Sequence, residues 1–380
     1  MPNECVAGNG GCQGRSLRER SRLAPVKLSQ IDSQGVGGVA PRSEDERPTL
    51  EDVAAFAGVS RSTASRALND DAYVSARSRE KVLAAARDLG YSPNQAARSL
   101  VTRRTGAIAV VLSEPEARLL DDPYRTAVMR AGYRELADVG CQMVLLFSDT
   151  REDLGRTVRF LEGGHVDGVL VFAPHRADPL PRALRLLKLP TVFGGQAADL
   201  RRGVHLVDFD NEGGARQAVT HLVESGRRRI ATIAGPQDQG APIDRLAGWR
   251  KTLVDAGIDP SGLAEEADFT LAGGAKAMAT LLERVPDLDA VFVGSDMMAV
   301  GALRTLSDAG RAVPGDVAVV SFDDNAALAP AMTPPLTSVH QDPREQVHAM
   351  VSTLMRLLDG EDVAPGAQIL PVSLVVRESS

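Results

Sequence analysis

A chain of 380 residues is too long for one average domain and predicts two or three, and its 43% hydrophobic and 24% charged residues are ordinary for globular proteins. The net charge of −7 taken alone argues against a nucleic-acid partner, but residues 47–105 carry a net charge of +4 and residues 106–380 carry −11. A small basic module ahead of a large acidic one favours a DNA-binding head on a ligand-binding body. No stretch approaches about 18 apolar residues, and the N-terminus lacks the apolar segment of a secretory signal, so we expect a cytoplasmic protein.

The first predicted elements follow a polar tail. Residues 1–46 are rich in Gly, Ser, Gln and Arg and show no apolar periodicity, which predicts a disordered N-terminal tail. Thr49 then opens a capping box for a first helix, which Gly58 ends, and Ser60 can cap a second helix. The expected helices cover about 50–57, 60–69, 76–89 and 94–102.

The first two of these helices, joined by a tight turn that contains glycine, form a helix-turn-helix pattern. In that motif the second helix lies in the major groove, where Arg suits the paired acceptors of guanine and Ser can donate or accept. Ala64 and Leu68 fall on the opposite, packed face. A small helical bundle without a DNA partner is the alternative for this pattern alone. The exposed residues of the second helix are expected to include Arg61, Ser62, Ser65, Arg66 and Asn69.

The longer stretch TLEDVAAFAGVSRSTASRALN, followed by VSARSREKVLAAARDLGYSPNQAARSL, closely resembles the head of the LacI/GalR family of repressors, almost without gaps. The resemblance implies that Arg61, Ser62 and Arg66 occupy positions that read bases. It also implies that a second set of residues contacts the phosphate backbone. That set is Thr49, Ser60, Asn69, Tyr73 and Ser75.

The same resemblance assigns the segment that begins at Asn94 and ends at Thr102 to a hinge helix, which in the family orders on operator binding. Leu100 matches the family's leucine that enters the minor groove at the operator centre. An apolar side chain there partly unstacks a base step and bends the duplex. Without the resemblance, Leu100 would be interpreted as an ordinary apolar anchor.

Seven short apolar or β-branched runs follow residue 106, and helical stretches separate most of them. This alternation predicts parallel sheets wrapped by helices, and a length of about 275 residues favours two such lobes. The expected strands are 107–112, 142–147, 168–172, 190–193, 230–234, 290–293 and 317–322.

This larger part is similar to the family's effector domain, which resembles periplasmic sugar-binding proteins. The implied fold is an all-α helix-turn-helix head plus an α/β effector domain of two parallel-sheet lobes, with the ligand between the lobes at strand carboxyl ends. We place the chain crossings between the lobes near Gly226, Gln341 and Asp359. The predicted domains are the tail at 1–46, the helix-turn-helix domain at 47–92, the hinge helix and linker at 93–105, and an effector-binding and dimerisation domain at 106–380, with lobe 1 at about 106–226 and 342–358 and lobe 2 at about 227–341 and 359–380.

Several polar residues follow the predicted strands, where a pocket would lie. Arg245, in RLAGW, and Asp323, in SFDD, match family positions that bind ligand, and a guanidinium or a carboxylate suits paired hydroxyls. Ser295 departs from the Asn-Asp pair that family members often have at its position, and Phe269 could stack on a sugar face or pack in the core. The predicted effector-binding residues are Tyr124, on the loop after the first strand, with Ser148, Arg245, Phe269, Ser295, Asp296, Asp323 and Gln341.

Three further features have structural interpretations. Trp249 is expected in the core, and the acidic cluster of Asp208 with Asp210 and Asn211 is assigned to helix capping, because a helix starts near it. The histidines are scattered, and the cysteines show neither ligand spacing nor a disulfide pattern, so we expect no metal, no cofactor and reduced thiols. These cysteines are Cys5, Cys12 and Cys141.

The sequence therefore predicts a sequence-specific DNA-binding transcriptional regulator, a repressor, controlled by a small-molecule effector that is a sugar or sugar derivative. Two heads on a homodimer would read a pseudo-palindromic operator, and a tetramer stays open. The alternative is a sugar-binding transport-type protein without a regulatory role, against which the head argues. An enzyme is not expected, because no phosphate loop or nucleophile elbow is present and nothing completes a site around Asp323 and Asp324.

Overall fold

A computed structural model describes the chain over 48–69, 73–92, 104–113, 122–148, 150–172, 174–176, 178–195 and 203–380. The chain divides into two compact units, residues 1–92 and residues 93–380, which are described separately. The predicted tail at 1–46 and the predicted hinge helix, with Asn94 and Leu100, lie outside the described residues. Cys5 and Cys12 lie outside them as well, and Cys141 is a half-buried free thiol.

The described residues of the first unit form three helices packed around one small core. The Thr49 hydroxyl accepts from the backbone N–H of Asp52 while the Asp52 carboxylate accepts from that of Thr49, so the predicted capping box is confirmed. Gly58 ends the first helix with a φ of 66°, a left-handed conformation that glycine adopts at little cost. Small side chains such as Ala64 fill the core and let the helices approach closely. The helices are α1 (Leu50–Ala57), α2 (Arg61–Leu68) and α3 (Ala76–Asp88).

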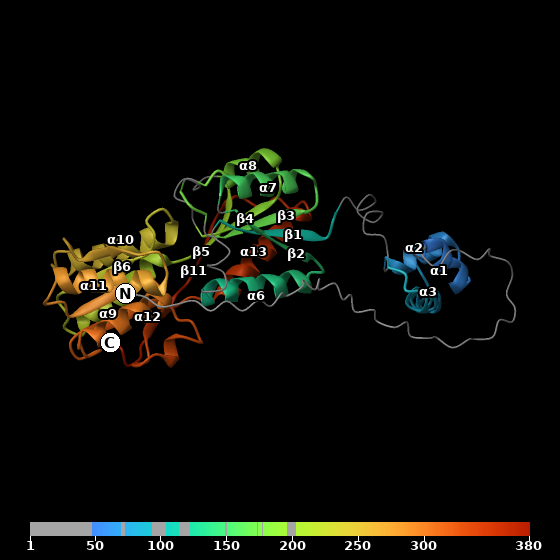
Figure 1. The fold of residues 1–380 in the computed structure, drawn as a ribbon. Coiled ribbons are helices and arrows are strands. Elements are labelled where there is room, and N and C mark those ends of the chain that lie inside the picture. Colours follow the sequence, from blue (N-terminus) through green and yellow to red (C-terminus); the bar gives the residue numbers. More distant parts are fainter. Residues whose placement is uncertain are drawn as a thin grey trace, which may run out of the picture. The chain divides into compact units, whose positions relative to one another are not determined.

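The second unit contains two lobes, and lobe 1 is a fully parallel six-stranded sheet in the order β11-β5-β4-β3-β1-β2 (Figure 1). Helices α6 and α13 cover one face, and α7 and α8 cover the other. Its strands are β1 (Ala107–Leu112), β2 (Gln142–Phe147), β3 (Gly168–Phe172), β4 (Thr191–Gly194), β5 (His205–Phe209) and β11 (Gly366–Leu370). Its helices are α6 (Pro123–Asp138), α7 (Arg151–Glu162), α8 (Leu180–Leu187) and α13 (Pro343–Leu358).

Lobe 2 is a six-stranded sheet in the order β12-β10-β9-β8-β6-β7, parallel except for β12 against β10. Helices α9 and α10 pack together, as do α11 and α12. Its strands are β6 (Ile230–Ala234), β7 (Ala264–Glu266), β8 (Ala290–Val293), β9 (Ala318–Asp323), β10 (Thr337–His340) and β12 (Ser373–Val375). Its helices are α9 (Asn211–Glu224), α10 (Gly240–Asp255), α11 (Leu271–Arg284), α12 (Asp296–Asp308) and the short 3-10 helix η1 (Ala329–Ala331).

Two of the three predicted chain crossings are wrong. The chain leaves lobe 1 at Asp210 rather than near Gly226, because α9 packs on α10 and its apolar side chains join the core of lobe 2. It returns to lobe 1 around Gln341, between β10 and α13. It does not leave again at Asp359, because β11 first pairs with β5 in lobe 1, and the last crossing lies at 371–372.

Continuous apolar runs account for the agreement between the predicted and observed strands. Five predicted strands match their observed bounds, and the runs 190–193 and 317–322 are each shifted by one residue. The fully buried Trp249 donates from its indole N–H to the carbonyl of Ile230, so its core position is confirmed. Among the described residues, no helix is both long and apolar enough to span a membrane.

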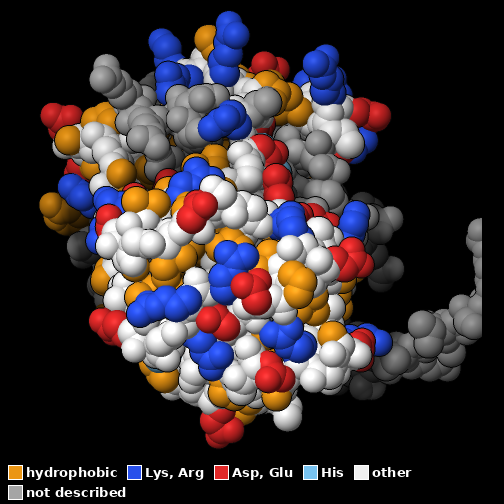
Figure 2. Space-filling model, turned by 90° about the vertical axis from the view of Figure 1, so that its left-hand side faces the viewer, with side chains coloured by type: hydrophobic (Ala, Val, Ile, Leu, Met, Phe, Trp, Pro, Cys, Tyr) orange, Lys and Arg blue, Asp and Glu red, His pale blue; other side chains and the backbone are white. Residues whose placement is uncertain are grey.

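The surface of lobe 2 carries charges of both signs. Figure 2 shows one face of this lobe, on which acidic and basic side chains are interspersed with hydrophobic ones. Val254, on α10, is 58% exposed, although α10 buries its opposite face in the core of lobe 2. Mixed charge of this kind is ordinary for a solvated surface and does not by itself indicate a polyanionic partner.

Candidate functional site

The exposed face of α2 is the candidate DNA-reading surface. Arg61, Ser62 and Arg66 are exposed, whereas Ala64 and Ala67 are buried against α1 and α3. The predicted packing of Ala64 is confirmed, and Leu68 is half-buried. The arginines and serine therefore project from one side of a short helix whose other side is fixed by the core of the unit.

Several of the predicted phosphate-contacting residues also cap helices. The hydroxyls of Thr49, Ser60 and Ser75 accept from backbone N–H groups at the starts of α1, α2 and α3. The Asn69 amide donates to the carbonyl of Ser65, 2.9 Å away, and Tyr73 is 93% exposed. Thr49, Ser60 and Ser75 thus lie at helix N-termini, where backbone N–H groups favour anions.

The second site is a cavity between the two lobes of the larger unit. Its empty space amounts to about 910 Å³, part of which is open to solvent. It lies at the carboxyl ends of strands of both sheets, where ligands bind in open α/β folds. The polar residues that line it are Asp122, Tyr124, Arg125, Asp208, Asn211, Gln239, Arg245, Ser295, Asp323, Gln341 and Gln346.

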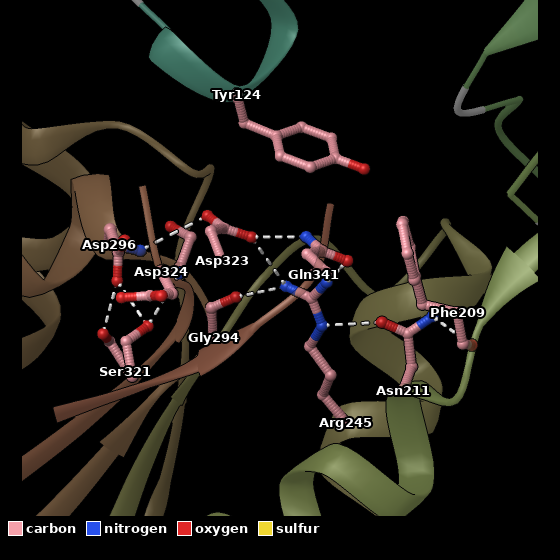
Figure 3. Close-up of polar contacts among 12 residues, drawn as sticks. Tyr124, Phe209, Asn211, Arg245, Gly294, Asp296, Ser321, Asp323, Asp324 and Gln341 are labelled. Carbon is pink, nitrogen blue, oxygen red and sulfur yellow. Dashed lines mark hydrogen bonds and ion pairs between the residues drawn. The ribbon is translucent and has the colours of Figure 1, made fainter. Parts of the chain in front are cut away.

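Arg245, on α10, organises the polar side of this cavity (Figure 3). Its side chain is 8% exposed, and its Nε donates to Asn211 Oδ1 over 2.9 Å. One terminal nitrogen donates to the Gly294 carbonyl, 2.6 Å away, and the other donates to Gln341 Oε1, 3.4 Å away. Burial lowers the pKa of Arg245, and the neighbouring carboxylate of Asp323 opposes that shift. The guanidinium is therefore held in one orientation before any ligand arrives.

Asp323 lies beside this guanidinium at the end of β9. Its Oδ1 accepts from the Gln341 amide over 2.7 Å and lies 3.7 Å from Nη1 of Arg245. Burial raises the pKa of Asp323 well above its ordinary range, and the charge of Arg245 counteracts this. Asp323 has a φ of 109° and Asp324 a φ of 49°, conformations that strain residues other than glycine. Asp323 lines the cavity from this position.

Tyr124 approaches the same cavity from lobe 1 (Figure 3). It lies in the first turn of α6, not on a loop as predicted, because Asp122 caps the helix and Pro123 is its first residue. Its hydroxyl donates to Gln346 Oε1 over 3.4 Å, and burial raises its pKa, with the charge of Asp323 adding to the rise. The phenol therefore stays protonated and can both donate and accept a hydrogen bond.

Asp208 and Asn211 are cavity residues that the sequence interpretation missed. Asp208 lies near the carboxyl end of β5, and its carboxylate accepts from the amide of Asn211 over 3.1 Å. Both residues line the cavity. Asp210 caps α9, so only this member of the cluster has the predicted capping role. If β5 is recognised as a strand, the polar residues at its carboxyl end become candidates for the cavity.

The pair Ser295 and Asp296 divides between two roles. Ser295 lines the cavity and caps α12. Asp296 is 1% exposed and does not line the cavity, because its carboxylate points into lobe 2 (Figure 3). It accepts from the hydroxyls of Ser321 and Ser338 and from the backbone N–H of Asn325. Burial raises its pKa to about 6.

Ser148 and Phe269 are the remaining predicted cavity residues. Phe269 lines the cavity with a φ of 64°, and its ring packs against the backbone of Gly235. Ser148 follows β2, the edge strand of lobe 1, and therefore lies away from the carboxyl ends that form the cavity. It lines a separate cavity with Ser113, Thr150 and Asp178, among others.

Direct contacts join the lobes at one rim of the cavity. His175 Nδ1 lies 2.8 Å from an oxygen of Asp238, and the Gln239 amide nitrogen lies 3.1 Å from His175 Nε2. The backbone N–H of Arg176 donates to the Asp238 carbonyl over 2.7 Å. An imidazole with its proton on Nδ1 satisfies both partners. The lobes are thus in contact in this conformation.

The donors and acceptors of the cavity suit a polyhydroxylated ligand. One guanidinium, carboxylates and side-chain amides offer paired hydrogen bonds, and the apolar lining includes Phe209, Phe269 and Phe172. In the part of the chain that the structure describes, no group of three His, Cys, Asp or Glu side chains is placed to hold a metal ion.

Two family models match the chain. Residues 49–94 match bacterial regulatory proteins of the lacI family, and residues 219–380 match the periplasmic binding protein-like domain. The HTH-type transcriptional regulator CelR of Thermobifida fusca is 45% identical over 335 residues, which are 88% of this chain and 98% of that protein. The ribose operon repressor of Escherichia coli (strain K12) is 34% identical over 302 residues, 79% of this chain and 89% of that protein.

Solved structures agree with this relationship. A complex of the transcriptional regulator CelR with cellobiose has a TM-score of 0.69 and 43% identity, and the match covers 88% of this chain and all of that chain. The lac repressor dimer bound to operator and the anti-inducer ONPF has a TM-score of 0.77 and 31% identity, over 88% and 99% of the two chains. These relatives are transcriptional regulators and repressors, and the expected fold class is confirmed. The chain belongs to the lacI family of bacterial regulatory proteins.

Proposed function

We propose that this regulator is a repressor that binds operator DNA as a homodimer through α2, and that a sugar bound between the lobes controls its DNA affinity. The observation that carries the proposal is the arrangement of Arg245, Asp323 and Gln341, joined by hydrogen bonds at the floor of the cavity between the lobes. Such a fixed set of paired donors and acceptors recognises neighbouring hydroxyl groups.

In the head, Arg61, Ser62 and Arg66 are the proposed base-reading residues. They are exposed on α2, and the second helix of a helix-turn-helix places its N-terminal residues against base edges. Helix-end residues such as Thr49 and Ser75 position the head on the phosphates. An operator read in this way is pseudo-palindromic, because two heads are related by a two-fold axis. A cytoplasmic location follows from a DNA target in a bacterial cell.

Cellobiose is the first candidate for the sugar. The relative with 45% identity over nearly its whole length is CelR, whose solved structure is described as a complex with cellobiose. The ribose operon repressor is a more distant relative, with 34% identity. A β-linked glucose disaccharide is therefore the class to test first, and single pentoses come after it.

The relative arrangement of the two lobes is the conformational equilibrium that a sugar can shift. Residues of both lobes line the cavity, so a ligand that contacts both would favour one relative arrangement of lobe 1 and lobe 2. If the two arrangements differ in their affinity for DNA, sugar binding changes DNA binding. Either sign of control is consistent with this coupling.

The test uses the full chain and the DNA upstream of its own gene. We expect a shifted complex at moderate salt, and we expect Arg66→Ala to reduce the ratio of specific to non-specific affinity. In a panel of sugars that includes cellobiose, at least one sugar should raise the melting temperature of the protein, because a ligand that binds the native state stabilises it. Absence of any specific DNA complex would contradict the regulatory function, and absence of stabilisation by any sugar would contradict the effector class.

A further inference from the structure

Arg61 and Glu51 form an ion pair between the first two helices of the head. Glu51 lies in the first turn of α1, and Arg61 is the first residue of α2. The Arg61 Nε lies 2.6 Å from Glu51 Oε1, and the two side chains are 71% and 57% exposed. The pair therefore lies at the surface, at the N-terminal end of the helix that projects toward DNA.

The position of Arg61 is electrostatically unfavourable without this partner. A helix N-terminus has partial positive charge and disfavours a cation, and the first turn of α2 contains no acidic residue. Glu51 supplies the missing negative charge from the neighbouring helix. An exposed ion pair of this kind contributes little to folding stability, so its main consequence is the orientation of the Arg61 side chain.

The hydrogen bond to Glu51 occupies one edge of the Arg61 guanidinium. Because Nε faces the carboxylate, the two terminal nitrogens form the edge that is left to contact another group. Two parallel N–H donors on that edge match the O6 and N7 acceptors of guanine in the major groove. The nearby carboxylate also repels phosphate oxygens, which lowers the tendency of Arg61 to contact the DNA backbone.

We propose that Glu51 is a specificity-determining positioning residue, which holds Arg61 end-on for a guanine in each operator half-site and keeps it away from phosphate. This inference rests on the proposed DNA-binding function. It implies opposite changes when the carboxylate is removed. Base discrimination falls, because Arg61 samples other orientations, while non-specific affinity rises, because one negative charge is lost near the duplex.

The experiment begins with selection of preferred duplexes from a randomised palindromic DNA library by the full-length protein. The position read by Arg61 is the symmetric position whose base preference is lost in Arg61→Ala. Affinities are then measured by fluorescence anisotropy for duplexes carrying each of the four base pairs there. We expect the unsubstituted protein to prefer guanine at least about fivefold, the lower end for a bidentate contact. Glu51→Ala should reduce that preference to about twofold or less.

Three further proteins separate orientation from charge and folding. Glu80→Ala removes another exposed acid, on α3, and should raise non-specific affinity without changing the base preference. Glu51→Gln keeps an acceptor oxygen and should retain part of the preference. Glu51→Ala combined with Arg61→Ala should have the same base preference as Arg61→Ala alone, because the two residues determine that preference through one contact.

The outcomes distinguish this inference from the function on which it rests. If Glu51→Ala and Glu51→Gln both keep the full base preference, or if Arg61→Ala changes no base preference, the role of Glu51 is overturned. A uniform loss of affinity for all sequences in the Glu51 variants would show a structural role instead and would also overturn it. If the unsubstituted protein enriches no sequence at all, the DNA-binding function itself is wrong.

Discussion

The guanidinium of Arg245 lies over the ring of Phe322, with its central carbon 3.6 Å from the ring centroid. Phe322 is fully buried on β9, so the ring supports one face of the guanidinium from within lobe 2. Asn211, Gly294 and Gln341 hold the edges. A stacked and bonded guanidinium has little rotational freedom to lose when a ligand binds, which favours affinity.

Arg245→Ala should abolish the response to sugar while leaving operator binding in place. The change removes the paired donors and leaves Asp323 buried beside an empty space, so we expect sugar affinity to fall by at least about tenfold. Titration calorimetry of the full chain with the stabilising sugar measures this. Arg250→Ala removes an exposed arginine of the same helix and should change nothing. Equal losses in the two variants would contradict the assignment.

The pH dependence of stability should reflect the buried carboxyl of Asp296. Its pKa is about 6 in the folded chain and 3.8 ordinarily, so between these values the folded state binds a proton that the unfolded state does not. Stability from this group therefore rises as pH falls from about 6 to about 4. Three other carboxyls have lowered pKa values, so the stability that they contribute is lost only when the pH falls below about 3.8. These are Asp153, Asp259 and Asp342.

Asp296→Asn removes the titrating group, and the free energy of unfolding of both proteins can be measured by denaturant titration between pH 4.5 and about 7. We expect the variant to be less stable, because its amide N–H₂ would face the backbone N–H of Asn325. We also expect its stability to rise less steeply toward low pH. Parallel pH profiles for the two proteins would show that Asp296 titrates normally.

The contact between His175 and Asp238 should favour the arrangement in which the lobes touch. His175→Ala removes the side-chain bonds to Asp238 and Gln239 across the cavity rim. Since both side chains are partly exposed, the pair is worth roughly 0.2–1 kcal/mol, and sugar affinity should weaken by at most about fivefold. The ring of His165 packs on Phe160 within lobe 1, so His165→Ala is the matched control and should leave sugar affinity unchanged. Unchanged sugar affinity in His175→Ala would exclude a contribution of this contact.

The sequence predicted the strands that contain a continuous apolar run and missed those that do not. Runs such as 168–172 are uninterrupted apolar segments because helices cover both faces of a parallel sheet. In contrast, β11 is an exposed edge strand, and β10 buries Thr337 and Ser338, so neither has an apolar run. The crossing placed at Asp359 failed for this reason, since the strand that follows it was not identified.

The errors at the candidate site have different causes. The capping role predicted for Asp208 and Asn211 overlooks β5, whose carboxyl end brings them to the cavity. Ser148 matches a pocket position of the family, but the order of strands puts β2 at the sheet edge. Asp296 follows a strand that does reach the cavity, and its inward rotation depends on Ser321 and Ser338, which are distant in sequence.

Control of operator affinity by a sugar is tested most directly by titration of the selected operator duplex with the full-length protein, at fixed salt and with or without saturating cellobiose. We expect the Kd to change by about fivefold or more in the presence of the sugar, the lower end of typical allosteric coupling, and not to change for Arg245→Ala. A sugar that stabilises the protein but leaves the operator Kd unchanged would contradict this control.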